Sequence, residues 1–230
     1  MRRLRVGWPD ERPFAGRAGR PVRVLAVSDE RDATLAVERN RAAIEPVDLI
    51  VGCGDVEPDW LAFLADAFQA PLVFVRGNHD RGLGWRSAAG GIPEPLAGGA
   101  AISVAGIELV GFEWPGVEQP GNRRHDGTAW RHVLGAAWRS ARRRALGRVR
   151  PILVVSHVAP RGVGDGPDPY HHGIAAYRWL LDRLRPPLWL HGHTTLATVD
   201  EPDVRHERST VVNVTGAVVV DLEPPAPSRA

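Results

Sequence analysis

The chain has 230 residues and a mass of 25.0 kDa, with 43% apolar residues and a formal net charge of +2 at pH 7. This length supports one α/β domain with a sizeable core and leaves too little chain for two such domains. The single cysteine, Cys53, excludes an internal disulfide, and no stretch is apolar over the roughly 18 residues that a membrane-spanning helix needs.

Arginine supplies every basic side chain, because the 29 basic positions include no lysine. A biased genome composition would produce this pattern. It also favours partners that carry phosphate-like anions, since the planar guanidinium pairs with them through two hydrogen bonds. Without a disulfide, a recognisable signal peptide or a membrane span, we expect the protein in the reducing cytoplasm.

Both ends of the chain have the composition of flexible extensions. Residues 1–20 mix Arg, Gly and Pro without a hydrophobic period, and residues 223–230 contain three prolines. We therefore predict a flexible N-terminal arm over 1–20, a single domain over 21–222 and a flexible C-terminal tail over 223–230.

The first part of the domain alternates predicted strands with predicted helices. Apolar runs at 22–27, 48–51 and 71–75 have the length and composition of buried strands. Between them, 33–44 is compatible with a helix, and apolar residues recur at helical spacing over 60–68. This alternation is typical of a parallel α/β sheet.

Antiparallel strands enter in the middle of the chain. Residues 100–104 and 107–112 flank the turn Ala105-Gly106 and predict a β-hairpin. The segments expected after it are strands at 151–155, 188–190, 196–199, 210–214 and 217–222 and a helix at 174–184. The sequence therefore predicts an α/β fold in which the sheets are mixed rather than purely parallel.

A helix with an arginine-rich face is predicted over 130–141. The apolar residues that recur at helical spacing and mark its buried face are Trp130, Val133, Leu134, Ala137, Trp138 and Ala141. The other face carries Arg131, Arg139 and Arg142 to Arg144. A basic face of this kind is either simply solvated or a nucleic-acid surface. Because no aromatic residues are interleaved with the arginines, we favour the solvated face and do not expect nucleic acid as a partner.

Polar side chains stand directly after five of the predicted strands. They are Asp29, Asp55, Asn78, His157 and His193. Each has an ordinary explanation on its own, because an aspartate can cap a helix and a buried histidine can be a satisfied core residue. Together they indicate a site, since parallel strands bring their carboxyl ends to one edge of a sheet. Carboxylate, amide and imidazole donors form a mixed set suited to Mn, Fe, Zn, Co or Ni.

Five motifs in a fixed order make the chain resemble the calcineurin-like metallophosphoesterase superfamily from about residue 22 to residue 222. They are Ser28-Asp29, Gly54-Asp55, Gly77-Asn78-His79-Asp80, Ser156-His157 and Gly192-His193. The resemblance implies a four-layer α/β/β/α sandwich, in which two packed mixed β-sheets are flanked by helices. It also implies metal-assisted hydrolysis of phosphomonoesters or phosphodiesters.

The resemblance assigns the polar residues to a centre for two metal ions. Asp55 would bridge the two ions. One ion would be completed by Asn78, His157 and His193, all of which are present. The first ion therefore has its full set of expected ligands.

The second ion lacks two of the ligands that the resemblance requires. It would need Asp29 together with histidines at positions 31 and 195, where this chain has Arg31 and Thr195. A guanidinium cannot be deprotonated and so cannot ligate a metal. We expect one tight metal site and a second site that is empty, weak or repaired by another group. The candidate replacements are His171, His172 and His191.

Three further residues are expected around the metal ions. The resemblance gives His79 the role of protonating the leaving oxygen or stabilising charge on the phosphate. Arg31 either pairs with Asp29 and Asp55 or clamps a substrate phosphate through two hydrogen bonds. His171 belongs to a loop that lies near the site in a small prokaryotic branch of the superfamily, where it would contact substrate or brace the loop.

The sequence therefore predicts a metal-dependent phosphoesterase that acts on a small phosphodiester or a nucleotide. Its catalytic residues would be His79 and Asp55, and its cofactor a divalent transition metal such as manganese. The two lost ligands leave a second hypothesis open, in which the protein binds a nucleotide or phosphate with little turnover. A nuclease has little support because no dedicated nucleic-acid module is recognisable, and no membrane partner is expected.

Overall fold

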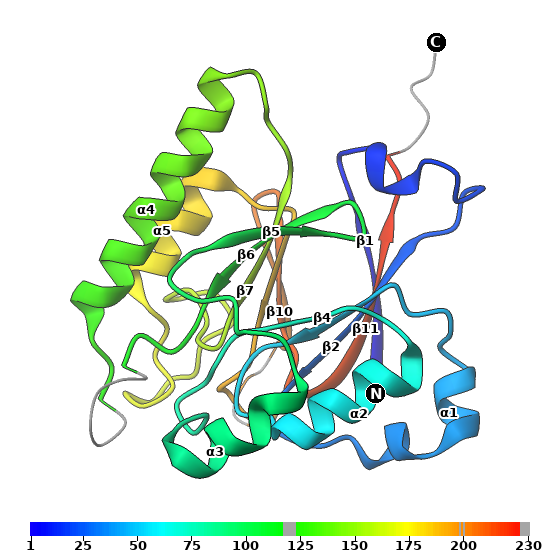
Figure 1. Ribbon diagram of the computed structural model, residues 1–230. Coiled ribbons are helices and arrows are strands. Elements are labelled where there is room, and N and C mark those ends of the chain that lie inside the picture. Colours follow the sequence, from blue (N-terminus) through cyan, green and yellow to red (C-terminus); the bar gives the residue numbers. More distant parts are fainter. Residues whose placement is uncertain (117–122, 198, 200, 226–230) are drawn as a thin grey trace.

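Figure 1 shows the computed structural model of the chain, which describes residues 1–116, 123–197, 199 and 201–225. The strands are β1 (Arg2–Gly7), β2 (Val22–Ser28), β3 (Leu49–Gly52), β4 (Leu72–Phe74), β5 (Ala101–Val104), β6 (Ile107–Phe112), β7 (Ile152–Ser156), β8 (Leu188–His191), β9 (Asp203–His206), β10 (Ser209–Asn213) and β11 (Gly216–Glu223). The helices are α1 (Glu38–Ala42), α2 (Pro58–Phe68), α3 (Gly82–Ala88), α4 (Asp126–Ala145) and α5 (Ala175–Leu184).

The strands form two sheets, and both are mixed. The first sheet has the order β1-β11-β2-β3-β4, and the second has the order β5-β6-β7-β8-β10-β9. In the first sheet β2, β3 and β4 run parallel, whereas β11 runs antiparallel to β2. In the second sheet β6, β7, β8 and β10 run parallel, with the antiparallel strands β5 and β9 at its edges. The predicted mixed sheets and the hairpin of β5 and β6 are confirmed.

The alternation of side chains along the strands separates three hydrophobic clusters and so creates four layers. Val51 of β3 and Leu153 of β7 belong to a cluster between the two sheets. The neighbouring Val154 points the other way and packs in a second cluster with α4 and α5, which lie together over this sheet in Figure 1. Ile50 joins a third cluster with α2. This α/β/β/α arrangement is the predicted fold.

The N-terminal segment is ordered, so the prediction of a flexible arm over 1–20 is wrong for this stretch. Arg2–Gly7 forms β1, which pairs in parallel with β11 along its whole length. Val6 and Trp8 are buried, while Arg3 and Arg5 alternate with them on the other face. An edge strand with one solvated face can carry arginine at every second position, and the interpretation of 1–20 as aperiodic missed this short alternation of arginine with apolar residues.

Two other predicted elements differ from the structure. The helix expected over 33–44 is instead a 3₁₀ turn at Ala33–Ala36 followed by the short helix α1. The strand expected over 196–199 does not form at Leu196, which lies in a turn, and Thr198 lies outside the described residues. The corresponding strand is β9, which pairs antiparallel with β10.

The C-terminal segment is only partly described. Glu223, the first residue of the predicted tail, is the last residue of β11, and its carbonyl accepts a hydrogen bond from the amide of Trp8 at 2.8 Å. Residues 226–230 of that predicted tail lie outside the described residues. The strand therefore continues one residue beyond the predicted end of the domain.

Helix α4 packs on the sheet through its smaller side chains, which include Val133 and Ala137 of the predicted face but not the large residues assigned to it. The side chains that it buries are Ala129, Val133 and Ala136. Trp130, Leu134 and Trp138, which were assigned to the buried face, are exposed, with Trp138 at 68%. The larger apolar residues lie toward α5, where Trp130 packs on Trp179 at a centroid distance of 6.0 Å. None of the helices in the described part of the chain combines the length and the apolarity that crossing a bilayer requires.

Candidate metal centre

The five polar residues singled out from the sequence lie beyond the carboxyl ends of strands in both sheets. Asp29, Asp55 and Asn78 follow the parallel strands β2, β3 and β4 of the first sheet. His157 and His193 follow the parallel strands β7 and β8 of the second sheet. The site is therefore built where the same edges of the two sheets meet.

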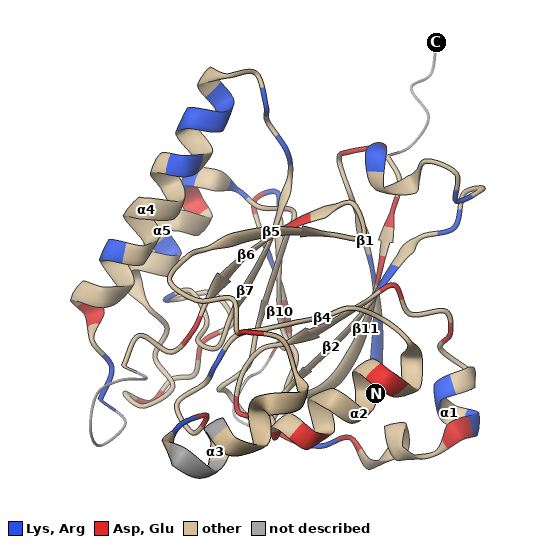
Figure 2. Cartoon of the chain, viewed as in Figure 1, with Lys and Arg blue, Asp and Glu red and all other residues tan. Residues whose placement is uncertain are grey.

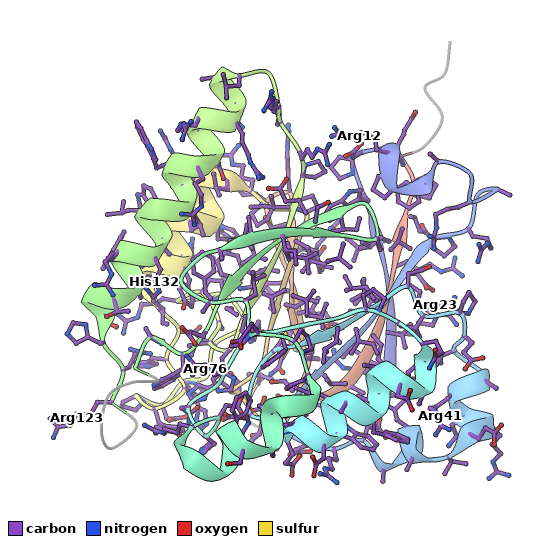
Figure 3. The ribbon with its side chains drawn as sticks, in the orientation of Figure 1. Arg12, Arg23, Arg41, Arg76, Arg123 and His132 are labelled. Carbon is purple, nitrogen blue, oxygen red and sulfur yellow. The ribbon has the colours of Figure 1, made fainter. Side chains whose placement is uncertain are left out.

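Hydrogen bonds and an ion pair connect the two sheets at this edge. The amide of His193 donates to Oδ2 of Asp29 at 2.9 Å, which joins the loop after β8 to the loop after β2. Arg76, labelled in Figure 3, follows β4 and pairs at 2.7 Å with Glu113, which follows β6. The loops that carry the polar residues are thus braced against one another rather than held by their own strands alone.

Three of the site residues have a left-handed backbone, which non-glycine residues rarely adopt. The φ angles are 60° at Asp29, 56° at Asp55 and 67° at His193. Each costs roughly 1–2 kcal/mol relative to the right-handed conformation. Such strain persists only where the surrounding structure fixes it, and it concentrates at functional sites. Here it turns the chain sharply at the end of each strand and directs the side chains toward the junction between the sheets.

Two motif glycines leave room for the carboxylates. A Cβ atom at Gly77 would collide with the carboxylate of Asp55. A Cβ atom at Gly192 would collide with the hydroxyl of Ser28 and the carboxylate of Asp29. These glycines are required by the close approach of backbone and side chain. The motif letters around the polar residues therefore have a steric role in placing them.

His157 is the residue on which the other donors converge. It is fully buried, and its Nδ1 lies 2.8 Å from the carbonyl oxygen of Cys53. Because a carbonyl can only accept, Nδ1 carries the proton and donates this bond. The other nitrogen, Nε2, lies 2.8 Å from Oδ1 of Asn78 and 3.2 Å from Oδ2 of Asp55. Three electron-rich atoms thus face one another in a buried place.

This cluster requires a positive charge between its members. Burial alone lowers the pKa of His157, but the hydrogen bond and charge of Asp55, together with the charge of Asp29, raise that pKa to about 9. Burial raises the pKa of Asp55, but His157 outweighs burial and lowers it overall. A second proton on His157 satisfies the oxygens in the absence of any ion. A divalent cation would satisfy them in the same way while leaving Nε2 as its ligand.

Tyr170 holds two of the expected ligands, and the sequence interpretation missed it. Its hydroxyl accepts a hydrogen bond from Nδ2 of Asn78 at 3.0 Å, which turns Oδ1 of that amide toward His157. Its carbonyl lies 3.1 Å from Nε2 of His193 and accepts a hydrogen bond from that nitrogen, which leaves Nδ1 of His193 without the proton. Burial and the nearby His157 lower the pKa of His193 to about 3, so its ring is neutral and can ligate.

Asp80 and Trp114 complete the support of this half of the site. Oδ2 of Asp80 accepts hydrogen bonds from the amides of Asp55 at 2.6 Å and Gly77 at 2.8 Å, which joins the loops after β3 and β4. Burial and the charge of Asp55 raise the pKa of Asp80 to about 6. The indole of Trp114 packs on the ring of His193 at a centroid distance of 5.1 Å. Tyr170 lies in a loop far from the strand ends in the sequence and gave no signal, whereas Trp114 stands two residues after β6 but carries no side chain typical of a metal ligand.

The other half of the site is built differently. Oδ2 of Asp29 is occupied by the amide of His193 and by the hydroxyl of Thr215 at 3.4 Å. Arg31 does not pair with Asp29 or Asp55, because its Nε donates to Glu57 at 3.0 Å and its guanidinium lies 5.5 Å from the centroid of the Trp60 ring. Its side chain is 50% exposed. The interpretation of Arg31 as a partner of these two aspartates is therefore wrong.

The remaining candidates occupy different positions around the centre. Thr195 is exposed, and His79 is exposed with its amide donating to Oδ1 of Asp55 at 2.7 Å. The ring of His79 makes no hydrogen bond within the described part of the chain, so no orienting partner for it is seen there. His171 lies beside the centre, with its ring 5.4 Å from that of His193 and its Nδ1 2.6 Å from Oδ2 of Asp168.

Two histidines considered as replacement ligands are engaged elsewhere. His172 places Nε2 3.0 Å from the carbonyl of Pro167. His191 is fully buried, and its Nδ1 lies 3.1 Å from the carbonyl of Gly192. Among the three proposed replacements, His171 is the one whose ring contacts a residue of the site.

The donor set fits a divalent transition metal. One oxygen of Asp29, one oxygen of Asp55 and one ring nitrogen of His157 lie within 4.8 Å of one another. The amide oxygen of Asn78 joins the same point through its 2.8 Å approach to His157. Oxygen and imidazole donors in this proportion suit Mn, Fe, Zn, Co or Ni. The residues that would bring a ligand atom to this point are Asp29, Asp55, Asn78 and His157, and the ring of His193 lies beside that of His157 at a centroid distance of 5.0 Å.

Comparisons with known proteins find a matching family model and similar solved structures. The family model described as calcineurin-like phosphoesterase matches residues 27–195, which is well over half of the chain. No curated protein matches. One solved structure aligns with 87% of this chain and 95% of its own at 16% identity and a TM-score of 0.59.

Two further solved structures align with the chain at low identity. A putative 5'-nucleotidase from Staphylococcus aureus aligns with 86% of this chain and 50% of its own at 14% identity and a TM-score of 0.55. A protein from Thermus thermophilus aligns with 85% of this chain and 90% of its own at 14% identity and a TM-score of 0.49. At these identities the likeness to the first structure and to the nucleotidase shows the fold alone.

Proposed function

Because the chain belongs to the calcineurin-like phosphoesterase family, we propose that it hydrolyses a small phosphodiester or a nucleotide with the help of one tightly bound divalent transition metal. The observation that carries this proposal is the convergence of Asp55 and Asn78 on Nε2 of His157, whose other nitrogen is already fixed by a carbonyl. We expect manganese to support the reaction.

The chain's own groups have distinct tasks in this proposal. A bound divalent cation lowers the pKa of water and polarises a phosphoryl group. Asp55 and His157 would bind the metal ion. The hydroxyl of Tyr170 accepts a hydrogen bond from the amide of Asn78 and so keeps the amide oxygen turned toward that ion. His79 lies on the exposed side of Asp55, where its ring is free to give a proton to the departing oxygen of the ester.

The surroundings of the centre support a small substrate with a planar part. Tyr170 is 49% exposed, and its ring packs between those of His171 and His193 at centroid distances of 5.0 Å each. An exposed aromatic face beside the metal ligands is suited to a nucleobase or an aryl group. His171, oriented by Asp168, would contact the phosphate or its leaving group. Arg31 would have to break its ion pair with Glu57 before it could contact a substrate.

Hydrolysis of an aryl phosphodiester tests the proposal. Stripped protein is reloaded with Mn, Fe, Co, Ni or Zn, and release of nitrophenol from bis(p-nitrophenyl) phosphate is measured. We expect turnover with manganese, and His79→Ala should lower it by about 10²–10⁴-fold without loss of bound metal. His206→Ala, which removes a histidine bonded to Asp182 away from the centre, is the matched control and should retain activity. Inert protein in all five metals would overturn the enzyme proposal.

A second function is favoured by the two missing ligands. The protein would bind a nucleotide or phosphate at the single metal and release it unchanged, because a one-metal centre stabilises fewer of the developing charges. Tight binding of a nucleotide by metal-loaded protein, without hydrolysis in the same five metals, would support this alternative. We further propose a cytoplasmic location, based on the lone buried cysteine.

A further inference from the structure

A basic groove of about 1290 Å³ lies at the other end of the second sheet from the metal centre. The second half of α4, the segment 148–151, the end of α5 and the N-terminal turn at Arg12 line it. Figure 2 shows arginines in blue along this end of α4 and on the segment that follows it. Figure 3 places Arg12 at the same end of the molecule.

The groove carries a large excess of positive charge. Eight arginines line it, against the two acidic residues Asp10 and Glu108. Asp10 pairs with Arg12 at 2.8 Å, and Glu108 pairs with Arg143. The lining arginines that form no ion pair with an acidic residue in the described part of the chain are Arg144, Arg148, Arg150, Arg183 and Arg208. Several guanidinium groups are therefore available to an external anion.

Exposed aromatic and aliphatic side chains lie among these arginines. Trp138 and Leu134 of α4 are 68% and 52% exposed, and Trp179 of α5 is 38% exposed; all three line the groove. Trp130 extends the patch, since its ring lies 6.0 Å from that of Trp179. Large apolar side chains grouped on a surface mark a binding site more often than a simply solvated face.

The groove is separate from the metal centre. Ile152, the first residue of β7, lines the groove, whereas His157 follows the last residue of the same strand. Pro187 precedes β8 in the groove, and His193 follows β8 at the centre. Five strand residues at about 3.3 Å each place the two sites about 16 Å apart along the sheet. A ligand bound in the groove is therefore not the substrate at the metal.

We propose that this groove binds single-stranded nucleic acid. Unpaired guanidinium groups match a row of phosphates, and exposed indole rings offer faces on which unpaired bases stack. A duplex hides its base faces, so the tryptophans favour a single strand. A membrane surface would require apolar side chains on a protruding rather than a hollowed surface. The structure also removes the reason for not expecting nucleic acid, because tryptophans and arginines share this surface.

Fluorescence anisotropy of labelled 12-nucleotide oligothymidine and oligouridine tests the proposal. The buffer contains EDTA, so that the metal centre cannot capture the phosphates. We expect binding to weaken with salt, and Arg144→Gln with Arg148→Gln and Arg150→Gln to weaken it at least about tenfold. The slope of log affinity against log salt should flatten by about 2, at about 0.7 for each phosphate contact with a single strand. Trp138→Ala should weaken binding about tenfold through lost stacking.

A charge-matched variant distinguishes binding in the groove from attraction of the oligonucleotide to arginines anywhere on the surface. Arg5, Arg20 and Arg39 are exposed arginines that do not line the groove, so changing all three to Gln removes the same charge elsewhere. This control should bind within about threefold of the wild type. The groove variants should hydrolyse the aryl phosphodiester at the wild-type rate, so loss of binding and loss of hydrolysis are separate outcomes.

Three results would overturn the proposal. The first is that neither oligonucleotide binds, and the second is that the groove triple variant and the charge-matched control bind equally. The third is binding to another partner in place of the oligonucleotides. Sedimentation with phosphatidylglycerol vesicles tests a membrane, and competition by polyglutamate tests an acidic protein. Groove-dependent binding to vesicles or polyglutamate without binding to oligonucleotides would assign the surface to a membrane or an acidic protein. A difference between oligothymidine and oligouridine would identify DNA or RNA as the natural form.

Discussion

The two halves of the candidate metal centre differ in their residue types and in how firmly the surrounding structure holds them. Asn78, His157 and His193 are buried, and each has a hydrogen bond from its non-ligating side to a fixed partner. On the other side, Thr195 is exposed and Arg31 is turned to Glu57 at the surface. The groups that hydrogen-bond to the ligands set the tautomer and the orientation of each ligand. The half that has these partners is therefore the half that can hold an ion.

The largest effect is expected at the centre of the ordered half. His157→Ala removes the nitrogen on which Asp55 and Asn78 converge, and metal affinity should fall by well over about 100-fold, with hydrolysis lost in parallel. Equilibrium dialysis with manganese measures the affinity. His157→Gln, which keeps most of the volume, distinguishes loss of the ligand from loss of the fold. Unchanged metal content in both variants would remove His157 from the site.

A smaller effect is expected at Tyr170, which hydrogen-bonds to a ligand but is not itself a ligand. Tyr170→Phe deletes the hydroxyl that holds Asn78 but keeps the carbonyl that holds His193, so metal affinity should fall about 10–100-fold. Tyr177→Phe removes the chain's other tyrosine hydroxyl, which lies 3.4 Å from the carbonyl of Glu113, and should leave affinity unchanged. Equal affinities in the two variants would mean that the hydroxyl of Tyr170 does not position Asn78.

The smallest effect is expected in the exposed half. Arg31→Ala breaks an exposed ion pair with Glu57, and such pairs contribute little to stability or to a distant site. Manganese affinity should change by less than about threefold, as measured by the same dialysis. A large gain in affinity would show that the guanidinium reaches the centre and repels the cation. A large loss would show that it supports a ligand.

Much of the fold followed from the sequence because its strands are short apolar runs that end in polar motifs. The order of strands and helices from β2 to β8 is regular, and the hairpin of β5 and β6 has a clear turn at Ala105-Gly106. The edge strands were harder to predict from the sequence. β1 alternates arginine with apolar residues, and its position depends on a partner more than 200 residues away, which no local pattern encodes.

The site was predictable where backbone geometry alone gathers residues. Parallel strands bring Asp29, Asp55 and Asn78 together at one edge, and a short polar motif after each strand marks them. Tyr170 comes from a loop whose course depends on tertiary packing, and Trp114, although it follows β6, has no ligand atom that would mark it as part of a metal site. The side-chain direction of Arg31 could not be predicted either, because its partners Glu57 and Trp60 are brought to it by the packing of α2 beside the loop after β2.

Counting bound metal ions tests the contrast between the two halves most directly. Protein stripped of metal is loaded with manganese, freed of excess ion and measured by mass spectrometry of the metal per chain. We predict one ion in the wild type, one in Arg31→Ala with Thr195→Ala, and two in Arg31→His with Thr195→His, together with a higher rate of hydrolysis in the last. Two ions in the wild type, with no gain in the double-histidine variant, would contradict a centre with one ordered half.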